Sequence, residues 1–239
     1  SGSTERGVAF VKQVGNFVGD EPWADRGDKL TENSRAALII DPPSGKLPQR
    51  TPYGKELSGQ YFAQMAGPTN DPEDRTVLER CITAPLVPIR PLNFNNNIKI
   101  VQSPDFVVIL NEMIHDTRII PIGKPTTAAV ESGQARWLGV SQGHWQDETL
   151  VVVTTNFRDY PNLLGTSPKM HLTERFTRIG PSELRYEFTV NDPAVFVKPW
   201  TARQTLRRLQ GRIYEYACHE GNLSMTLMLR GARLAETAE

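Results

Sequence analysis

The sequence predicts a mainly β protein: a curved antiparallel sheet or a calycin- or lipocalin-like barrel, with a short helical and extended N-terminal arm. Three observations predict this class. Runs rich in β-branched residues recur from Asn97 onward, turn residues separate them, and prolines and helix-start signals precede them. We expect residues 1–90 to form an arm whose short helices pack on the sheet. Residues 91–234 are expected to form the antiparallel β domain, and the whole chain one structural domain.

The N-terminal arm contains one connector and three helix signals. Asp41–Gly45 holds two adjacent prolines, which fix φ and remove hydrogen-bond donors, so it predicts a turn or extended connector. Thr51 before Pro52 is typical of a helix start. The predicted helices are a first one from Thr51 through Met65, a second from Asp71 to Cys81 and a weaker one over Glu5–Phe17.

The β-rich part is expected to contain ten strands. Ser141-Gln142-Gly143 predicts a turn that leaves His144 exposed, and Gly180-Pro181-Ser182 predicts a hairpin. The expected strands are Ile98–Gln102, Asp105–Ile114, Thr117–Ile122, Arg136–Val140, Thr149–Asn156, His171–Ile179, Glu183–Val190, Thr205–Leu209, Arg212–His219 and Ser224–Leu229.

Composition excludes several classes of function. Lys plus Arg equals Asp plus Glu at 27 each, so the chain lacks the basic excess that drives nucleic-acid binding. No apolar run approaches the roughly 20 residues of a membrane span. The motifs of nucleotide-binding loops, dinucleotide-binding folds and α/β-hydrolases are missing, as are clusters with the spacing of metal ligands. We therefore expect no cofactor and no metal ion.

Two carboxylates fall on otherwise apolar strand faces. Alternation places Glu112 beside Ile114, and Glu174 between Leu172 and Phe176. A carboxylate in such a place must be paired, or its pKa must rise, which is how a general acid or base is made. The other interpretation is an internal ion pair, with Arg118 or Arg178 as the partner.

His219 is the first candidate for a titrating catalyst, because it lies where a predicted strand ends, and His115 is the second. In this hypothesis His219 or Glu112 removes a proton from the substrate. Tyr216 or Arg118 stabilises the developing oxyanion, and Glu174 orients the base.

Aromatic side chains of the β-rich part could line a pocket for a flat apolar ligand. Trp200 follows Pro199, so we expect it in a loop, as a lid or rim residue. The candidate ligand-binding residues are Trp137, Trp145, Tyr186, Trp200 and Tyr214.

The spacing of Cys81 and Cys218 alone leaves open whether they form a disulfide or remain two buried thiols. Both cysteines fall within a series of segments that occur in a fixed order: Leu38–Pro48, Asp71–Arg75, Glu79–Cys81, Val107–Pro121, Trp137–Gly139, Thr149–Val152, Thr154–Phe157, His171–Phe176, Tyr186–Val190 and Tyr214–Asn222. Through these segments the chain resembles a large bacterial family of hypothetical proteins that often carry an export signal. The resemblance implies an exported and disulfide-linked protein but no particular reaction. Departures from the family pattern occur at Val140, Gln142 and Gln146.

The sequence supports three functions. The first is a cofactor-independent lyase or isomerase that uses general acid/base chemistry on a small hydrophobic or aromatic molecule. The second is a lipocalin-like protein that binds such a molecule without catalysis. The third is an exported structural or partner-binding protein. Ser1-Gly2-Ser3 is typical of cloning, and no signal peptide is seen, so a periplasmic or secreted location would require its earlier removal. A cytoplasmic location and a homodimer stay open.

Overall fold

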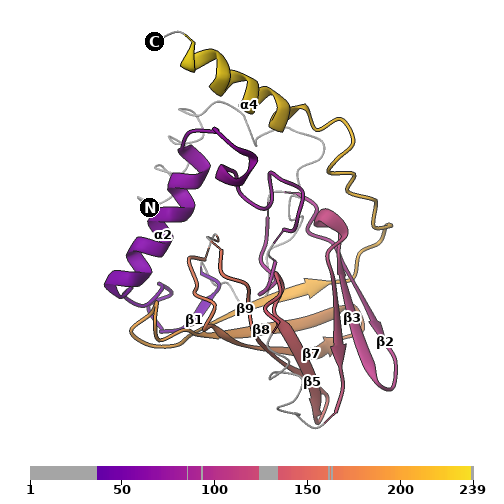
Figure 1. Cartoon of the computed structure of the whole chain (residues 1–239). Helices are drawn as coiled ribbons and strands as arrows, with labels where there is room; N and C mark the ends of the chain where they lie inside the picture. The colour runs from indigo at the N-terminus through magenta and orange to yellow at the C-terminus, as the bar shows by residue number, and fades with distance from the viewer. Residues whose placement is uncertain are drawn as a thin grey trace, which may run out of the picture.

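The computed structural model describes residues 37–84, 86–92, 94–123, 134–160, 162 and 164–237. The described part is mainly β, as the sequence predicts, with two antiparallel sheets and few helices (Figure 1). The helix expected over Glu5–Phe17 lies outside the described residues.

The larger sheet has six strands in the order β1-β9-β8-β7-β6-β5. From β5 to β9 each strand pairs antiparallel with the next one, and short turns join β5 to β6 and β7 to β8. The strands are β1 (Ile39–Asp41), β5 (Val140–Gln146), β6 (Thr149–Thr155), β7 (His171–Gly180), β8 (Glu183–Asn191) and β9 (Trp200–Arg207).

The smaller sheet has three strands in the order β2-β3-β4: β2 (Ile98–Gln102), β3 (Phe106–Asn111) and β4 (Thr117–Pro121). A parallel bridge between Ile122 and Gly143 joins the end of β4 to β5. Figure 1 shows the strand direction turning strongly from β9 and β8 to β3 and β2. The strands described here do not close into a barrel, because β2 is an edge and no ladder joins it to β9.

The core lies on the face where the two sheets meet. Alternation along β8 buries Tyr186, Phe188 and Val190, and on β3 it buries Val107 and Ile109. The largest core cluster joins side chains from β3, β4, β6, β7, β8 and β9 with Leu57 of the arm, so the two sheets and the arm share one core.

The N-terminal arm is built into this core. Thr51 caps α2 (Pro52–Ala66) by accepting a hydrogen bond from the N–H of Gly54 at 3.0 Å, as the sequence predicts. Leu57 of α2 is buried in the main core, and a Cβ at Gly54 would lie 2.5 Å from the Val195 carbonyl oxygen. Glycine therefore lets the helix approach the sheet.

The helix predicted from Asp71 to Cys81 is wrong beyond its first turn. The described chain has only a short 3-10 helix at Pro72–Asp74 and turns after it. Arg75 instead turns inward, pairing with Glu79 at 2.5 Å and donating to the Met65 carbonyl.

The turn expected at Ser141-Gln142-Gly143 is also wrong, because these residues lie inside β5. The reversal occurs at Asp147 and Glu148, between paired Gln146 and Thr149, with Asp147 at φ 52°. Gly143 marks a close approach, since an added Cβ would lie 2.8 Å from Ile122 Cδ1. The strand expected over Arg136–Val140 shrinks to a single bridge at Arg136.

The predicted Asp105–Ile114 strand stops at Asn111. A short 3-10 turn, Met113–His115, follows, in which Ile114 and His115 have φ of 54° and 45°. Left-handed backbone cannot continue a strand, so the chain reverses here into β4. Alternation on β4 holds as predicted, with Arg118 and Ile120 buried.

Two strands predicted at the C-terminal end are wrong. Residues 212–219 have no regular structure, and the segment predicted as Ser224–Leu229 lies in α4 (Leu223–Glu236). Leu, Met, Ala and Arg, which make up most of this segment, are strong helix formers. No helix in the described ranges is both long and apolar enough to cross a membrane.

Candidate functional site

A buried polar network crosses the core between the two sheets. Arg118 on β4 donates to both carboxylate oxygens of Glu174 on β7, at 3.1 and 2.5 Å. The OH of Tyr186 on β8 donates to Glu174 Oε1 at 2.6 Å. Glu174 is 0% exposed and both of its oxygens already accept hydrogen bonds from Arg118 or Tyr186, so this carboxylate faces protein groups and not solvent.

The remaining bonds of the network fix its geometry. Arg118 also donates to the hydroxyls of Ser141 and Thr154, each at 3.1 Å, and the Tyr186 oxygen accepts the Ile89 N–H at 3.0 Å. Burial has the largest single effect and lowers the pKa of the Arg118 guanidinium, but the charge and hydrogen bond of Glu174, together with Tyr186, outweigh it, so the net shift of this pKa is upward. Burial and the Glu174 charge raise the pKa of Tyr186. These groups form an internal ion pair, with Arg118 rather than Arg178 as the partner.

Glu112 is a second buried carboxylate that is held by hydrogen bonds. Its Oε2 accepts from Asn97 Nδ2 at 2.7 Å, and its Oε1 accepts from the N–H of Tyr214 at 3.2 Å. Glu112 therefore ties the start of β2 to the segment that follows β9. We call this segment, residues 208–215, the crossing segment.

A disulfide between Cys81 and Cys218 fixes the chain just beyond the crossing segment. The two cysteines are 137 residues apart in sequence. The spacing left open whether they form a disulfide or remain two buried thiols, and the structure contains the disulfide. In consequence the crossing segment is anchored at its two ends, by the end of β9 and by the disulfide.

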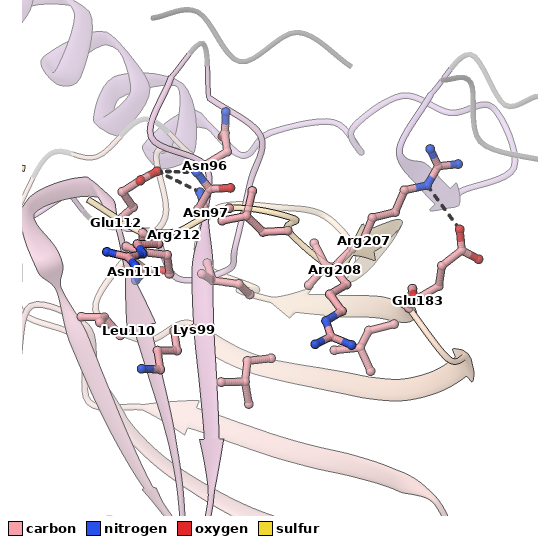
Figure 2. Close-up of a pocket in the computed structure, with 18 of the residues that line it drawn as sticks. Asn96, Asn97, Lys99, Leu110, Asn111, Glu112, Glu183, Arg207, Arg208 and Arg212 are labelled. Atoms are coloured by element: carbon pink, nitrogen blue, oxygen red, sulfur yellow. Dashed lines mark hydrogen bonds and ion pairs between the residues drawn. The ribbon is translucent and has the colours of Figure 1, made fainter. Parts of the chain in front are cut away.

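An open groove of about 1350 Å³ lies between the free edge of β2 and the end of β9 (Figure 2). β1 pairs with β9 only at Thr201 and Ala202, so the later residues of β9 form a second free edge. We call this the β2–β9 groove. Its lining residues are Asn96–Ile100, Leu110–Glu112, His115, Arg178, Gly180–Leu184, Thr205–Leu209 and Gly211–Glu215.

The β2–β9 groove combines an aliphatic lining with a basic rim. Aliphatic side chains come from both sheets and the crossing segment: Ile98, Ile100, Leu110, Leu184, Leu206, Leu209 and Ile213. Five basic residues line the same space, against three carboxylates, although the whole chain is neutral. The basic residues are Lys99, Arg178, Arg207, Arg208 and Arg212.

Asn111 lies at the β3 end of the groove. The strand pairing puts it opposite Ile98, on the face of β3 that also carries Val107 and Ile109. Its side chain is 1% exposed, and neither amide atom has a hydrogen-bond partner among the residues that the structure describes. A buried amide without partners is rare in a folded protein.

The predicted catalytic residues divide into three groups. Arg118 and Glu174 meet in the core, whereas Glu112 and His115 line the β2–β9 groove. His219 is exposed, and Tyr216 packs on a second small core cluster; neither lines the groove. The six candidates therefore do not form one constellation.

The predicted aromatic residues are also dispersed. Trp200 begins β9 and is 3% exposed, packed edge-on against Phe188 and Phe196, so its placement in a loop as a rim residue is wrong. The Trp200 ring lies on the face of β9 that is buried in the main core. The others lie in four places: Tyr186 in the core, Trp145 exposed on β5, Trp137 against Tyr160 and Arg158, and Tyr214 in the groove.

Sequence reasoning missed the basic rim and Asn111. A signal for the rim exists in Arg207, Arg208 and Arg212, which cluster within six residues. Asn111 ends an apolar run in which alternate residues are buried, so its position on the core side could be predicted.

Neither protein-family models, curated proteins nor solved structures gave a match to the chain. Within the described residues, no group of three or more His, Cys, Asp or Glu side chains is arranged to hold a metal ion.

Proposed function

We propose that the protein binds a small hydrophobic or aromatic molecule in the β2–β9 groove, in a lipocalin-like manner and without catalysis. The observation that carries this proposal is the open groove of about 1350 Å³ with its aliphatic lining. Ligand pockets are typically concave, mostly apolar and about 300–1,000 Å³ in volume. This groove has room for a ligand of ordinary size together with bound water.

The lining gives such a ligand a source of affinity. Burying apolar surface is worth about 25 cal/mol per Å², and Ile98 and Ile100 of β2 lie across the space from Leu206 of β9. An apolar ligand there would bridge the two free sheet edges. This is the sense in which the curved sheet is proposed to act like a calycin barrel.

A cofactor-independent lyase or isomerase is the second candidate. Glu112 and His115 both line the groove, so a carboxylate and an imidazole lie on the space where a ligand would sit. However, both oxygens of Glu112 already accept hydrogen bonds, and Arg118 with Glu174 is enclosed in the core. These contacts favour binding over proton transfer.

An exported location and membership of the bacterial family named above are further parts of the proposal. The Cys81–Cys218 disulfide supports export, because such bonds persist mainly in oxidising compartments. The homodimer stays a prediction, which light scattering of the purified protein would test.

Titration with a fluorescent apolar probe tests the binding proposal. Ile213→Ser removes apolar surface from the groove, whereas Ile119→Ser makes the same change on the exposed face of β4. We expect about tenfold weaker binding for the groove variant, from the lost apolar contact, and no change for the control. Equal binding by both variants would contradict the proposal.

The same protein preparation separates binding from catalysis. Native mass spectrometry before and after incubation with candidate ligands should find the ligand bound and unchanged. A product that differs from the ligand in mass, or in chromatographic retention if it is an isomer, and that disappears in His115→Gln and Glu112→Gln would favour the lyase or isomerase instead.

A further inference from the structure

We infer that the ligand of the β2–β9 groove is a carboxylic acid with an aliphatic body, whose carboxylate is held at the β3 end by Arg212 and Asn111. This inference rests on the proposed function and names the class of ligand. Asn111 is the observation that first points to it.

The Asn111 side chain is a buried hydrogen-bonding group that lacks a partner. Its backbone N–H is used, since it donates to the Asp116 carbonyl at 2.8 Å. Its side-chain amide is not used, although it is 1% exposed and belongs to a residue lining the groove. Leaving such a group unpaired is costly, and a ligand oxygen that accepts from Nδ2 would remove the part of that cost that belongs to the donor.

Arg212 brings a positive charge to the same end of the groove. It lies two residues before Tyr214, whose N–H donates to Glu112, the residue next to Asn111. Figure 2 shows Arg212, Asn111 and Glu112 together at this end. In the part of the chain that is described, the Arg212 guanidinium has no hydrogen bond or ion pair and is solvent-exposed.

Two of the three arginines at the opposite end are already engaged through their guanidinium groups. Arg207 pairs with Glu183 at 3.2 Å, and Arg178 donates to the carbonyls of Gly180 and Pro181. Arg208 also lies at this end, because its backbone N–H donates to the Ser182 carbonyl. The β3 end is therefore the one that offers a cation together with an unpaired buried amide.

The negative charge of Glu112 would repel an anion bound at the β3 end of the groove. Its Oε2 accepts from Asn97 and its Oε1 from Tyr214, so both oxygens face donors of the protein. A planar carboxylate fits the fork of a guanidinium, and charge-assisted bonds of this kind are about twice as strong as neutral ones. The acid would then extend its chain along Ile98, Ile100 and Leu206.

Paired ligands that differ only in the head group test the inference. Decanoate and decan-1-ol, each below the concentration at which it aggregates, are titrated against the whole protein by calorimetry. We expect decanoate to bind at least tenfold more tightly. Arg212→Gln should remove most of that difference and leave decan-1-ol binding unchanged, whereas Arg230→Gln on exposed α4 should change neither.

Asn111→Leu supplies an independent arm, with circular dichroism to confirm that the variant is folded. We expect a several-fold loss for decanoate alone. Equal binding of the acid and the alcohol, or an equal effect of Arg212→Gln on both, would overturn the acid inference while leaving apolar binding intact. Failure of both ligands to bind would overturn the acid inference and contradict the proposed function.

Discussion

Arg118 on β4 and Glu174 on β7 form a two-pronged ion pair across the core, and neither side chain is more than 3% exposed. The pair links the smaller sheet to the larger one, and Tyr186 completes it from β8. Because both charges are removed from water, each depends on the other for compensation.

Glu174→Gln is therefore expected to destabilise the protein by about 3–5 kcal/mol, since it leaves the Arg118 charge buried and uncompensated. Urea unfolding measures the change. Glu183→Gln is the matched control, because the Arg207–Glu183 pair is partly exposed and should be worth about 1 kcal/mol or less. Equal losses in both variants would contradict a compensating role for Glu174.

Tyr186→Phe should cost about 1–3 kcal/mol. It removes the hydroxyl that donates to Glu174 and accepts from Ile89, while the ring still fills its place in the core. Tyr53→Phe, on the exposed side of α2, should be neutral in the same unfolding experiment. A neutral Tyr186→Phe would show that the hydroxyl is dispensable to the network.

Removal of the disulfide should lower stability and weaken ligand binding. Cys81 and Cys218 are 137 residues apart, and loop-closure entropy for such a loop corresponds to about 5 kcal/mol. The double variant Cys81→Ser with Cys218→Ser should unfold at lower urea concentration. If it remains folded, its affinity for an apolar probe should fall, because the crossing segment loses an anchor. Unchanged affinity would mean that the hydrogen bond between Glu112 and Tyr214 holds the crossing segment without help from the disulfide.

Asp116 predicts a particular dependence of stability on pH. Burial raises the pKa of its carboxyl from 3.8, against the lowering effects of the Thr83 and Ala84 hydrogen bonds and the His115 charge. The native state then holds this proton more tightly than the unfolded state. The stabilising contribution is complete below 3.8 and is lost as the pH rises through the raised pKa.

Asp116→Asn cannot titrate, so its stability relative to the unsubstituted chain should rise as the pH increases above 3.8 and through the raised pKa of Asp116. Urea unfolding of both proteins across this range gives the difference, in which all other titrating groups cancel. A constant or falling difference would show that Asp116 is not the group responsible.

The parts of the fold set by local pattern were predictable. Alternation predicts the buried faces of β4 and β8, and Thr51 before Pro52 predicts the start of α2. Gly143 led to the wrong prediction of a turn, because glycine is common in turns. Here its lack of a side chain leaves space for Ile122. Residues 223–236 form a helix, in keeping with their many Leu, Met, Ala and Arg residues, whose helix propensity the predicted strand Ser224–Leu229 left out of account.

The candidate site was only partly predictable, because it depends on contacts between distant segments. The sequence suggests that Glu174 needs a partner and offers both Arg118 and Arg178, and only the fold decides between them. The β2–β9 groove arises where two free sheet edges face each other, so no single motif contains it. Asn111 and Arg212, 101 positions apart, come together through the crossing segment.

Mapping ligand contacts by nuclear magnetic resonance tests the central claim most directly. The isotopically labelled protein is titrated with decanoate, and the backbone amide shifts are followed. We expect the largest changes in β2, at the end of β9 and in the crossing segment, with little change in exposed α4. Changes centred on α4, or no saturable changes at all, would contradict ligand binding in the β2–β9 groove.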